Sequence, residues 1–296
     1  MRTVATTISI ALLLSAAAAR TEAKDFQQKV EADPKGSVEI SNVAGRVNVS
    51  GWDRPEVEVR GELGEGVERV EVKTSGNRTY VKVVLPRMSS HDGDADLDIQ
   101  VPNGSDLEIS TVSADVSVSG VNASQTLRTV SGDIRTELAG PRFQGKTVSG
   151  DLRLRGTSKA SDMHLETVSG DITLDRGAGD VEAVTTSGDL RLEIDPARSV
   201  RMRTVSGDLG FSGSLDSGAT LDAQTVSGEL SVRARAKSGF EYEANTFSGD
   251  IENCFGVSAQ RTSQYAPGSR LDGKVGEGKA QVHAKSMSGD VTICDH

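Results

Sequence analysis

The sequence predicts an all-β protein, specifically a β-solenoid of the parallel β-helix-like kind with an irregular β N-terminal lead-in. A short phrase, Thr-Val-Ser-Gly-Asp followed by an aliphatic residue, recurs nine times with small variations. Apolar residues alternate with polar ones on both sides of the phrase, which is the pattern of half-buried strands. Glycine is abundant, with 32 residues, and aromatic residues make up 3% of the chain. This composition favours thin, stacked β-coils with many corners over one deep globular core.

The spacing of the phrase predicts the size of one coil. The first seven intervals are 18 to 21 residues long and the last is 40. A unit of this size without a helix signal is typical of one β-solenoid coil, whose neighbours stack about 4.8 Å apart. An antiparallel sandwich is the alternative, but it does not require the same corner residue in every unit. The copies start at Thr111, Thr129, Thr147, Thr167, Thr185, Thr204, Thr225, Thr246 and Ser286.

The alternation changes phase within each phrase, which indicates a corner. Met163, Leu165 and Thr167 alternate up to the phrase, and Val168 and Ile172 resume one residue out of step. Both Thr167 and Val168 are therefore expected to point inward, with a bend at Ser-Gly. Glycine suits this bend because it adopts positive φ and leaves room for the coil above. The expected structural corners are Gly132, Gly150, Gly170, Gly188, Gly207, Gly228, Gly249 and Gly289.

The chain divides into three parts. Residues 1–23 carry Arg2, an apolar stretch and small residues, the layout of a signal peptide. Its apolar core of about 12 residues is shorter than the roughly 20 needed to span a bilayer. Residues 24–105 read as an irregular β lead-in. Residues 42–47 (Asn-Val-Ala-Gly-Arg-Val) echo the phrase and indicate degenerate coils, and the alternative is a cap on the open edge of the solenoid. Residues 106–296 form the repeat region, with a loop excursion near 255–285. The protein is therefore expected to be exported, with the periplasm as first choice and the cell surface or secretion as alternatives.

Three sets of residues resemble a known family. They are the Thr-Val-Ser-Gly-Asp phrases, residues 47–53 (Val-Asn-Val-Ser-Gly-Trp-Asp) followed by 57–59 (Val-Glu-Val), and residues 97–102 (Leu-Asp-Ile-Gln-Val-Pro). Together they resemble a bacterial domain-of-unknown-function family of proposed adhesins with β-strand repeats. The resemblance covers residues 36–296. It implies a β-helix-like stack and a place in the cell envelope, and it supplies no catalytic residues.

One acidic residue recurs at the same position of each phrase. A functional interpretation is a ladder of Ca²⁺ sites, because this cation prefers several oxygen ligands. The structural interpretation is that each carboxylate accepts hydrogen bonds from backbone N–H groups at its own corner, while Arg135, Arg153 and Arg191 balance the charge. The glycine-rich nonapeptide of Ca²⁺-binding β-rolls does not occur, which favours the structural interpretation and no metal or other cofactor. This acidic column comprises Asp115, Asp133, Asp151, Asp171, Asp189, Asp208, Glu229, Asp250 and Asp290.

The two cysteines occupy equivalent positions. Cys254 and Cys294 each lie eight residues after the start of their phrases. An oxidising compartment favours a disulfide, and the bond requires Cα atoms about 4.4–6.8 Å apart, as in adjacent coils. Residues 255–285 would then be an excursion and not a complete coil. The bond is expected to pin the last coil and cap the C-terminal end of the solenoid.

The net charge of −10 and the lack of a basic block argue against nucleic acid as a partner. The histidines are scattered, and the Ser-Gly pairs are corners and not nucleophile elbows. We expect a non-catalytic, exported cell-envelope protein, an adhesin-like scaffold that presents loops to an envelope protein or glycan. One alternative is a carbohydrate-active enzyme on a β-helix scaffold, where clustered carboxylates would act. The other is a calcium-stabilised structural stack.

Overall fold

The computed structural model describes residues 24–86, 93–157, 159, 161–262 and 267–295. The predicted signal peptide at residues 1–23 lies outside the described residues. The described chain is all-β, as the sequence predicts, with repeat-like strands in one large β-solenoid-like sheet. In this part of the chain no segment forms a helix with the length and apolarity needed to traverse a membrane.

The strands follow one another with short connections. They are β1 (Lys24–Glu31), β2 (Ser37–Ser41), β3 (Ala44–Trp52), β4 (Glu56–Leu63), β5 (Arg69–Ser75), β6 (Arg78–Val84), β7 (Asp94–Pro102), β8 (Asp106–Ser110), β9 (Ser113–Ser119), β10 (Gln125–Arg128), β11 (Ile134–Leu138), β12 (Arg142–Lys146), β13 (Leu152–Gly156), β14 (Ser161–Glu166), β15 (Ile172–Val184), β16 (Leu190–Arg203), β17 (Leu209–Ser227), β18 (Leu230–Ala236), β19 (Gly239–Ser248), β20 (Ile251–Asn253), β21 (Gln260–Arg261), β22 (Ser269–Gly276), β23 (Ala280–Ser288) and β24 (Val291–Cys294).

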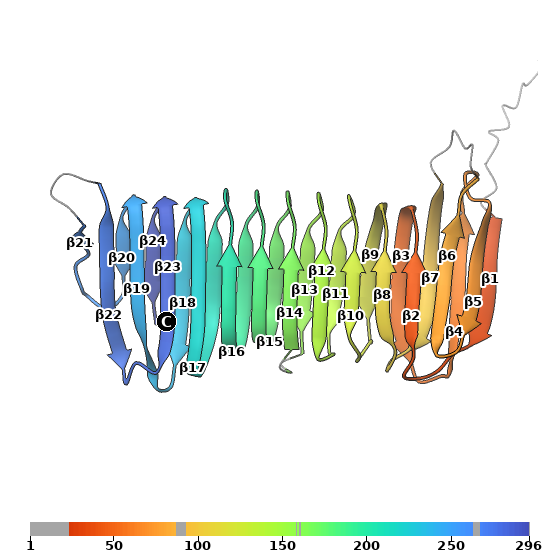
Figure 1. Ribbon diagram of the computed structural model, residues 1–296, viewed down its shortest axis with the longest axis horizontal. Coiled ribbons are helices and arrows are strands. Elements are labelled where there is room, and N and C mark those ends of the chain that lie inside the picture. Colours follow the sequence, from red (N-terminus) through yellow and green to blue (C-terminus); the bar gives the residue numbers. More distant parts are fainter. Residues whose placement is uncertain (1–23, 87–92, 158, 160, 263–266, 296) are drawn as a thin grey trace, which may run out of the picture.

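The strands form two parallel ladders that run along the long axis of the molecule (Figure 1). Each repeat contributes one strand to each ladder, joined by the Ser-Gly corner. The long strands β15, β16 and β17 begin in one ladder and continue into the other. Ladder A contains, in spatial order, β6, β2, β8, β10, β12, β14, β15, β16, β17, β23 and β19. Ladder B contains β7, β3, β9, β11, β13, β15, β16, β17, β18, β24 and β20.

The hydrophobic core lies between the two ladders. Ile134, Leu152 and Ile172 pair in register on ladder B and are fully buried. Leu127 and Leu165 are fully buried on ladder A. Each such side chain stabilises the fold by about 1.5–3 kcal/mol relative to an exposed one. The period-two alternation therefore identifies the inward face of the regular strands.

The spatial order of the repeats differs from the chain order at both ends. Strand β23 lies between β17 and β19, and β24 lies between β18 and β20 (Figure 1). The expectation that the last coil caps the C-terminal end is therefore wrong, because the repeat formed by β19 and β20 lies outside it. At the other end β2 lies between β6 and β8, and β3 lies between β7 and β9. Strands of the predicted lead-in thus pair directly with the repeat region.

Antiparallel strands cover the outer edges of the stack. At the N-terminal end β5 pairs with β6, and β4 and then β1 pair outside β7. At the other end β22 pairs with β19, and β21 pairs with β22. Covered edges offer fewer unpaired backbone groups to another chain, which limits edge-to-edge aggregation.

The corner differs from its prediction in the direction of the valine. Thr167 is 2% exposed, and its Oγ1 donates to the carbonyl oxygen of Gly150 in the neighbouring repeat, 3.2 Å away. Val168 is 42% exposed and faces solvent. The expectation that both residues point inward is wrong, because the phase break falls between Val168 and Ile172, where the backbone turns. A buried threonine hydroxyl at this site is satisfied by the stacked carbonyl.

The corner glycines are required mainly by close packing. The φ of Gly207, Gly228, Gly249 and Gly289 is 143° to 150°, as expected for glycine, but Gly170 does not have a positive φ. The predicted reason is therefore wrong for Gly170. A Cβ there would lie 2.1 Å from the carbonyl oxygen of the corner glycine below it. The other predicted reason, that glycine leaves room for the neighbouring coil, explains why glycine stands at position 170.

Candidate functional site

The acidic column forms a ladder of hydrogen bonds between repeats. The backbone N–H of Asp151 donates to Oδ1 of Asp133, 3.0 Å away, and the N–H of Asp171 donates to Oδ1 of Asp151 at 3.0 Å. We expected each carboxylate to accept a hydrogen bond from its own corner. Instead, each bond joins the carboxylate to the corner of the next repeat. Parallel, in-register stacking causes this, since it places the next corner beside the carboxylate. The same contact links Asp133 to Asp115, Asp189 to Asp171, Asp208 to Asp189, Glu229 to Asp208, and Asp250 to Asp290.

Arginines on ladder B contact this column. Arg135 lies 2.8 Å from Oδ2 of Asp133, and Arg153 contacts both Asp133, at 3.2 Å, and Asp151, at 2.7 Å. Burial raises the pKa of Asp133, but the backbone N–H of Asp151 and the two guanidinium groups outweigh it, so the pKa is lowered. Among the described residues no group of three or more His, Cys, Asp or Glu side chains is arranged to hold a metal ion. The hydrogen bonds and ion pairs thus account for stacked carboxylates without a cation.

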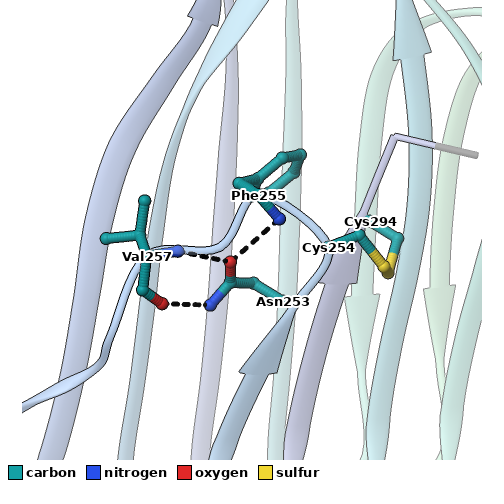
Figure 2. The surroundings of a disulfide bond; sticks show 5 residues. All are labelled: Asn253, Cys254, Phe255, Val257 and Cys294. Atoms are coloured by element: carbon teal, nitrogen blue, oxygen red, sulfur yellow. Dashed lines mark hydrogen bonds between the residues drawn. A yellow bond between two sulfur atoms is a disulfide. The ribbon is translucent and has the colours of Figure 1, made fainter.

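The two cysteines meet on adjacent strands (Figure 2). Cys254 follows β20 and Cys294 ends β24, and their sulfur atoms are joined with a Cα–Cα distance of 5.0 Å. Beside the disulfide, the side chain of Asn253 holds the turn after β20. Its Oδ1 accepts from the N–H of Phe255 at 3.0 Å, and its Nδ2 donates to the carbonyl of Val257 at 2.6 Å. Residues between the cysteines include β21, β22 and β23, so the chain leaves the stack and returns on its inner side.

A groove of about 830 Å³ lies on the outer face of ladder B, near its N-terminal end. Its floor is formed by short polar side chains on β3 and β9, where Asn48 pairs with Ser117 and Ser50 pairs with Ser119. The next strand along the ladder carries Arg135 beside Ser117. The groove exists because short side chains lie between longer ones on both sides.

The N-terminal wall of the groove contains a buried anion. Glu58 on β4 is 2% exposed, and its carboxylate accepts from Gln27 at 2.9 Å and from Arg60 at 2.8 Å, with Lys29 at 3.1 Å. Burial raises the pKa of Glu58, but the hydrogen bonds from Lys29, Gln27 and Arg60 outweigh it and lower the pKa. This carboxylate is therefore held in its charged form.

The opposite wall carries charged side chains with unused hydrogen-bonding capacity. Arg155 on β13 is paired across the sheet with Glu137 on one side and Asp175 on the other. Its guanidinium makes no hydrogen bond or ion pair with any other described residue. Arg135 and the neighbouring Arg153 also line the groove on this side, and Arg60 lines it on the N-terminal side, together with acidic side chains. The groove thus offers both donors and acceptors.

None of the residues of the groove floor was predicted from the sequence as a site. The available signal was the contrast between Ser117 and Ser119 and the charged residues at these positions in the next two repeats, which are Arg135 and Glu137, then Arg153 and Arg155. The histidines lie elsewhere: His164 is 3.3 Å from Glu182, and His283 is 3.7 Å from Glu243, all on ladder A. No histidine lines the groove.

The chain resembles several solved structures at low identity. The match with a proposed adhesin from Bacteroides fragilis covers 92% of this chain and 96% of the adhesin, at 10% identity and a TM-score of 0.44. The match with a proposed lipid-binding protein from Parabacteroides distasonis covers 91% of this chain and 96% of that protein, at 11% identity and a TM-score of 0.35. The match with a proposed cell adhesion protein from Clostridium sporogenes covers 92% of this chain and 99% of that protein, at 10% identity and a TM-score of 0.28. No curated protein matches the sequence. A match over residues 21–294 shows that the chain belongs to the Toastrack DUF4097 family.

Proposed function

We propose that this protein is a non-catalytic scaffold of the bacterial cell envelope, an exported adhesin-like β-solenoid of 18–21-residue coils that binds a glycan in the groove of ladder B. The observation that carries the proposal is the groove itself, with a floor of short polar side chains between charged walls. Hydroxyl-rich polymers need many donors and acceptors in a fixed arrangement, and strands hold side chains more rigidly than loops do.

The return segments support the choice of the groove over projecting loops. They were expected to present the binding surface. In the repeats of β15, β16 and β17 they continue the sheet, with Gly177 paired to Ile194 and Ile194 paired to Gly213. A long polymer would lie across several strands of ladder B, contacting Ser119, Arg155 and their neighbours. A protein partner remains the second candidate from the sequence and is addressed by the same experiment.

The pKa of Glu58 favours binding over hydrolysis. A glycosidase needs one carboxylic acid that is protonated at working pH, which requires a raised pKa. Glu58 is the most buried carboxylate of the groove, and its pKa is lowered. Its three hydrogen-bond donors suit a structural anion that fixes the N-terminal wall.

The test is a binding titration of the processed protein against purified envelope glycans. Arg155→Ala is expected to weaken glycan binding about tenfold, which corresponds to the loss of one hydrogen bond from a charged group. Arg233→Ala is the matched control, because Arg233 continues the same outward column of ladder B outside the groove. Equal binding by both variants, or a protein partner in place of any glycan, contradicts glycan binding in the groove. Release of shortened glycan during the titration contradicts the non-catalytic role.

A further inference from the structure

A stripe of exposed apolar side chains follows the corners along one edge of the stack. Its members are 40% to 58% exposed. They occupy the second position of the repeat phrase, directly after the buried threonine or serine. In spatial order they are Val112, Val130, Val148, Val168, Val205, Val226, Met287 and Phe247.

Thr186 occupies the same position between Val168 and Val205 and is the one polar interruption of the stripe between Val112 and Phe247. Val257 is the only other large hydrophobic residue this exposed among the described residues. With strands about 4.8 Å apart, the nine repeats from Val112 to Phe247 extend over about 40 Å. Single exposed apolar residues are ordinary on protein surfaces, but contiguous apolar patches mark interaction sites.

In four repeats the two flanks of the stripe carry opposite charges. Two positions before the stripe, at the end of ladder A strands, four repeats carry a basic residue, one carries Glu166 and the others are uncharged. Three positions after it, before the ladder B strands, every repeat carries an acidic residue. Because the two ladders are on opposite faces of the stack, the two charges lie on opposite sides of the stripe. The repeats with both charges contain the pairs Arg128 and Asp133, Lys146 and Asp151, Arg203 and Asp208, and Lys285 and Asp290.

We infer that the stripe is the interface of a homodimer in which a second copy packs edge to edge, parallel and in register. A twofold axis parallel to the stack places the ladder A flank of one copy against the acidic flank of the other, which pairs opposite charges in the four repeats named above and like charges at Glu166 and Asp171. An antiparallel arrangement places basic against basic and acidic against acidic. Charge complementarity therefore selects both the occupant and its direction.

Two basic residues are available for such contacts. Arg203 and Lys285 are exposed, and their side chains make no hydrogen bond or ion pair with another described residue. The charge of Lys285 does attract Glu243 and contributes to the lowered pKa of that carboxylate. In the parallel dimer Arg203 faces Asp208 of the second copy. Arg128 and Lys146 already contact Glu108 and Glu166, at 3.0 Å and 2.8 Å, so they contribute less.

The first test measures self-association of the processed protein by sedimentation equilibrium. We expect a dimer, and V148E, which places a carboxylate in the middle of the stripe, is expected to raise the dissociation constant at least tenfold. V257E is the matched control, since Val257 is 45% exposed and lies outside the stripe. Thermal unfolding of both variants checks that they fold. A monomer at about 100 μM, or a dimer that V148E leaves unchanged, overturns the inference.

The second test determines direction. V112C is treated with a short bis-maleimide, which links thiols only when they lie close together; the native cysteines are disulfide-bonded and do not react. In the parallel dimer Val112 of one copy lies opposite Val112 of the second copy, so V112C alone gives a linked dimer. In an antiparallel dimer, links form only in a mixture of V112C with F247C. That second pattern overturns the parallel register. R203E should also weaken the parallel dimer, and more strongly at low salt.

Discussion

Thr246 donates a hydrogen bond from Oγ1 to the carbonyl oxygen of Gly289, 3.0 Å away, although 43 residues separate them in the chain. The contact exists because the last repeat of the sequence lies inside the stack, next to the repeat of Thr246. Equivalent bonds join Thr225 to Gly207, at 3.3 Å, and earlier threonines to their neighbouring glycines. Ser286 occupies the same position, but its buried Oγ has no hydrogen-bond partner within the described chain.

Ser286→Thr is expected to stabilise the protein by about 1 kcal/mol, the usual value of one intramolecular hydrogen bond. The added methyl group restricts the side-chain rotamer and directs the hydroxyl toward the neighbouring repeat. The expected rise in melting temperature is about 2–4 °C for a chain of this size. Thr225→Ser, the reverse change one repeat away, should lower it. A melting temperature that falls in Ser286→Thr contradicts this account.

Gly170→Ala is expected to destabilise the protein by about 3 kcal/mol, because a Cβ would lie 2.1 Å from a backbone carbonyl oxygen. Gly170→Val should be worse for the same reason. Gly210→Ala is the control, since a Cβ there meets only ordinary contacts beyond 3.8 Å. Urea unfolding of the three variants measures the difference. Equal stability of Gly170→Ala and Gly210→Ala would mean that the repeats can separate at the corner at little cost.

The regular strands were predictable because burial follows a period of two, as at Ile134, Leu152 and Ile172. The outward direction of Val168 was not predictable, because the backbone turns at the corner and breaks the period of two. In the sequence, an apolar residue at a corner cannot be distinguished from a core residue. The position of the last repeat was also not predictable, because nearly the same interlocking residues recur in every repeat and do not specify which neighbour each one stacks on. The groove depends on differences in side-chain length between adjacent strands, which a single strand does not reveal.

The acidic column is expected to make stability dependent on pH. The pKa of Asp133 is lower in the folded protein than its ordinary value of 3.8. Such a carboxylate stabilises the fold above the unfolded pKa, and this contribution is lost as the pH falls through the folded pKa. Asp133→Asn should therefore show a smaller loss of melting temperature between about pH 5 and pH 2 than the unmodified protein. Identical profiles of melting temperature against pH contradict a role for this charge. Chelator should leave both profiles unchanged, whereas a large fall favours the calcium interpretation.

The disulfide is expected to hold the inserted repeat in its place. Cys254 and Cys294 close a loop with a sequence separation of 40 residues, for which the entropy of loop closure gives about 4 kcal/mol. A protein with both cysteines replaced by serine should unfold at a lower urea concentration, and hydrogen exchange should speed up first in β23 and β24. Mass spectrometry of the non-reduced protein checks the bond directly, because the peptides that contain Cys254 and Cys294 should appear as one linked species. Uniform acceleration of exchange across all strands would show instead that the inserted repeat does not unfold separately from the rest of the stack.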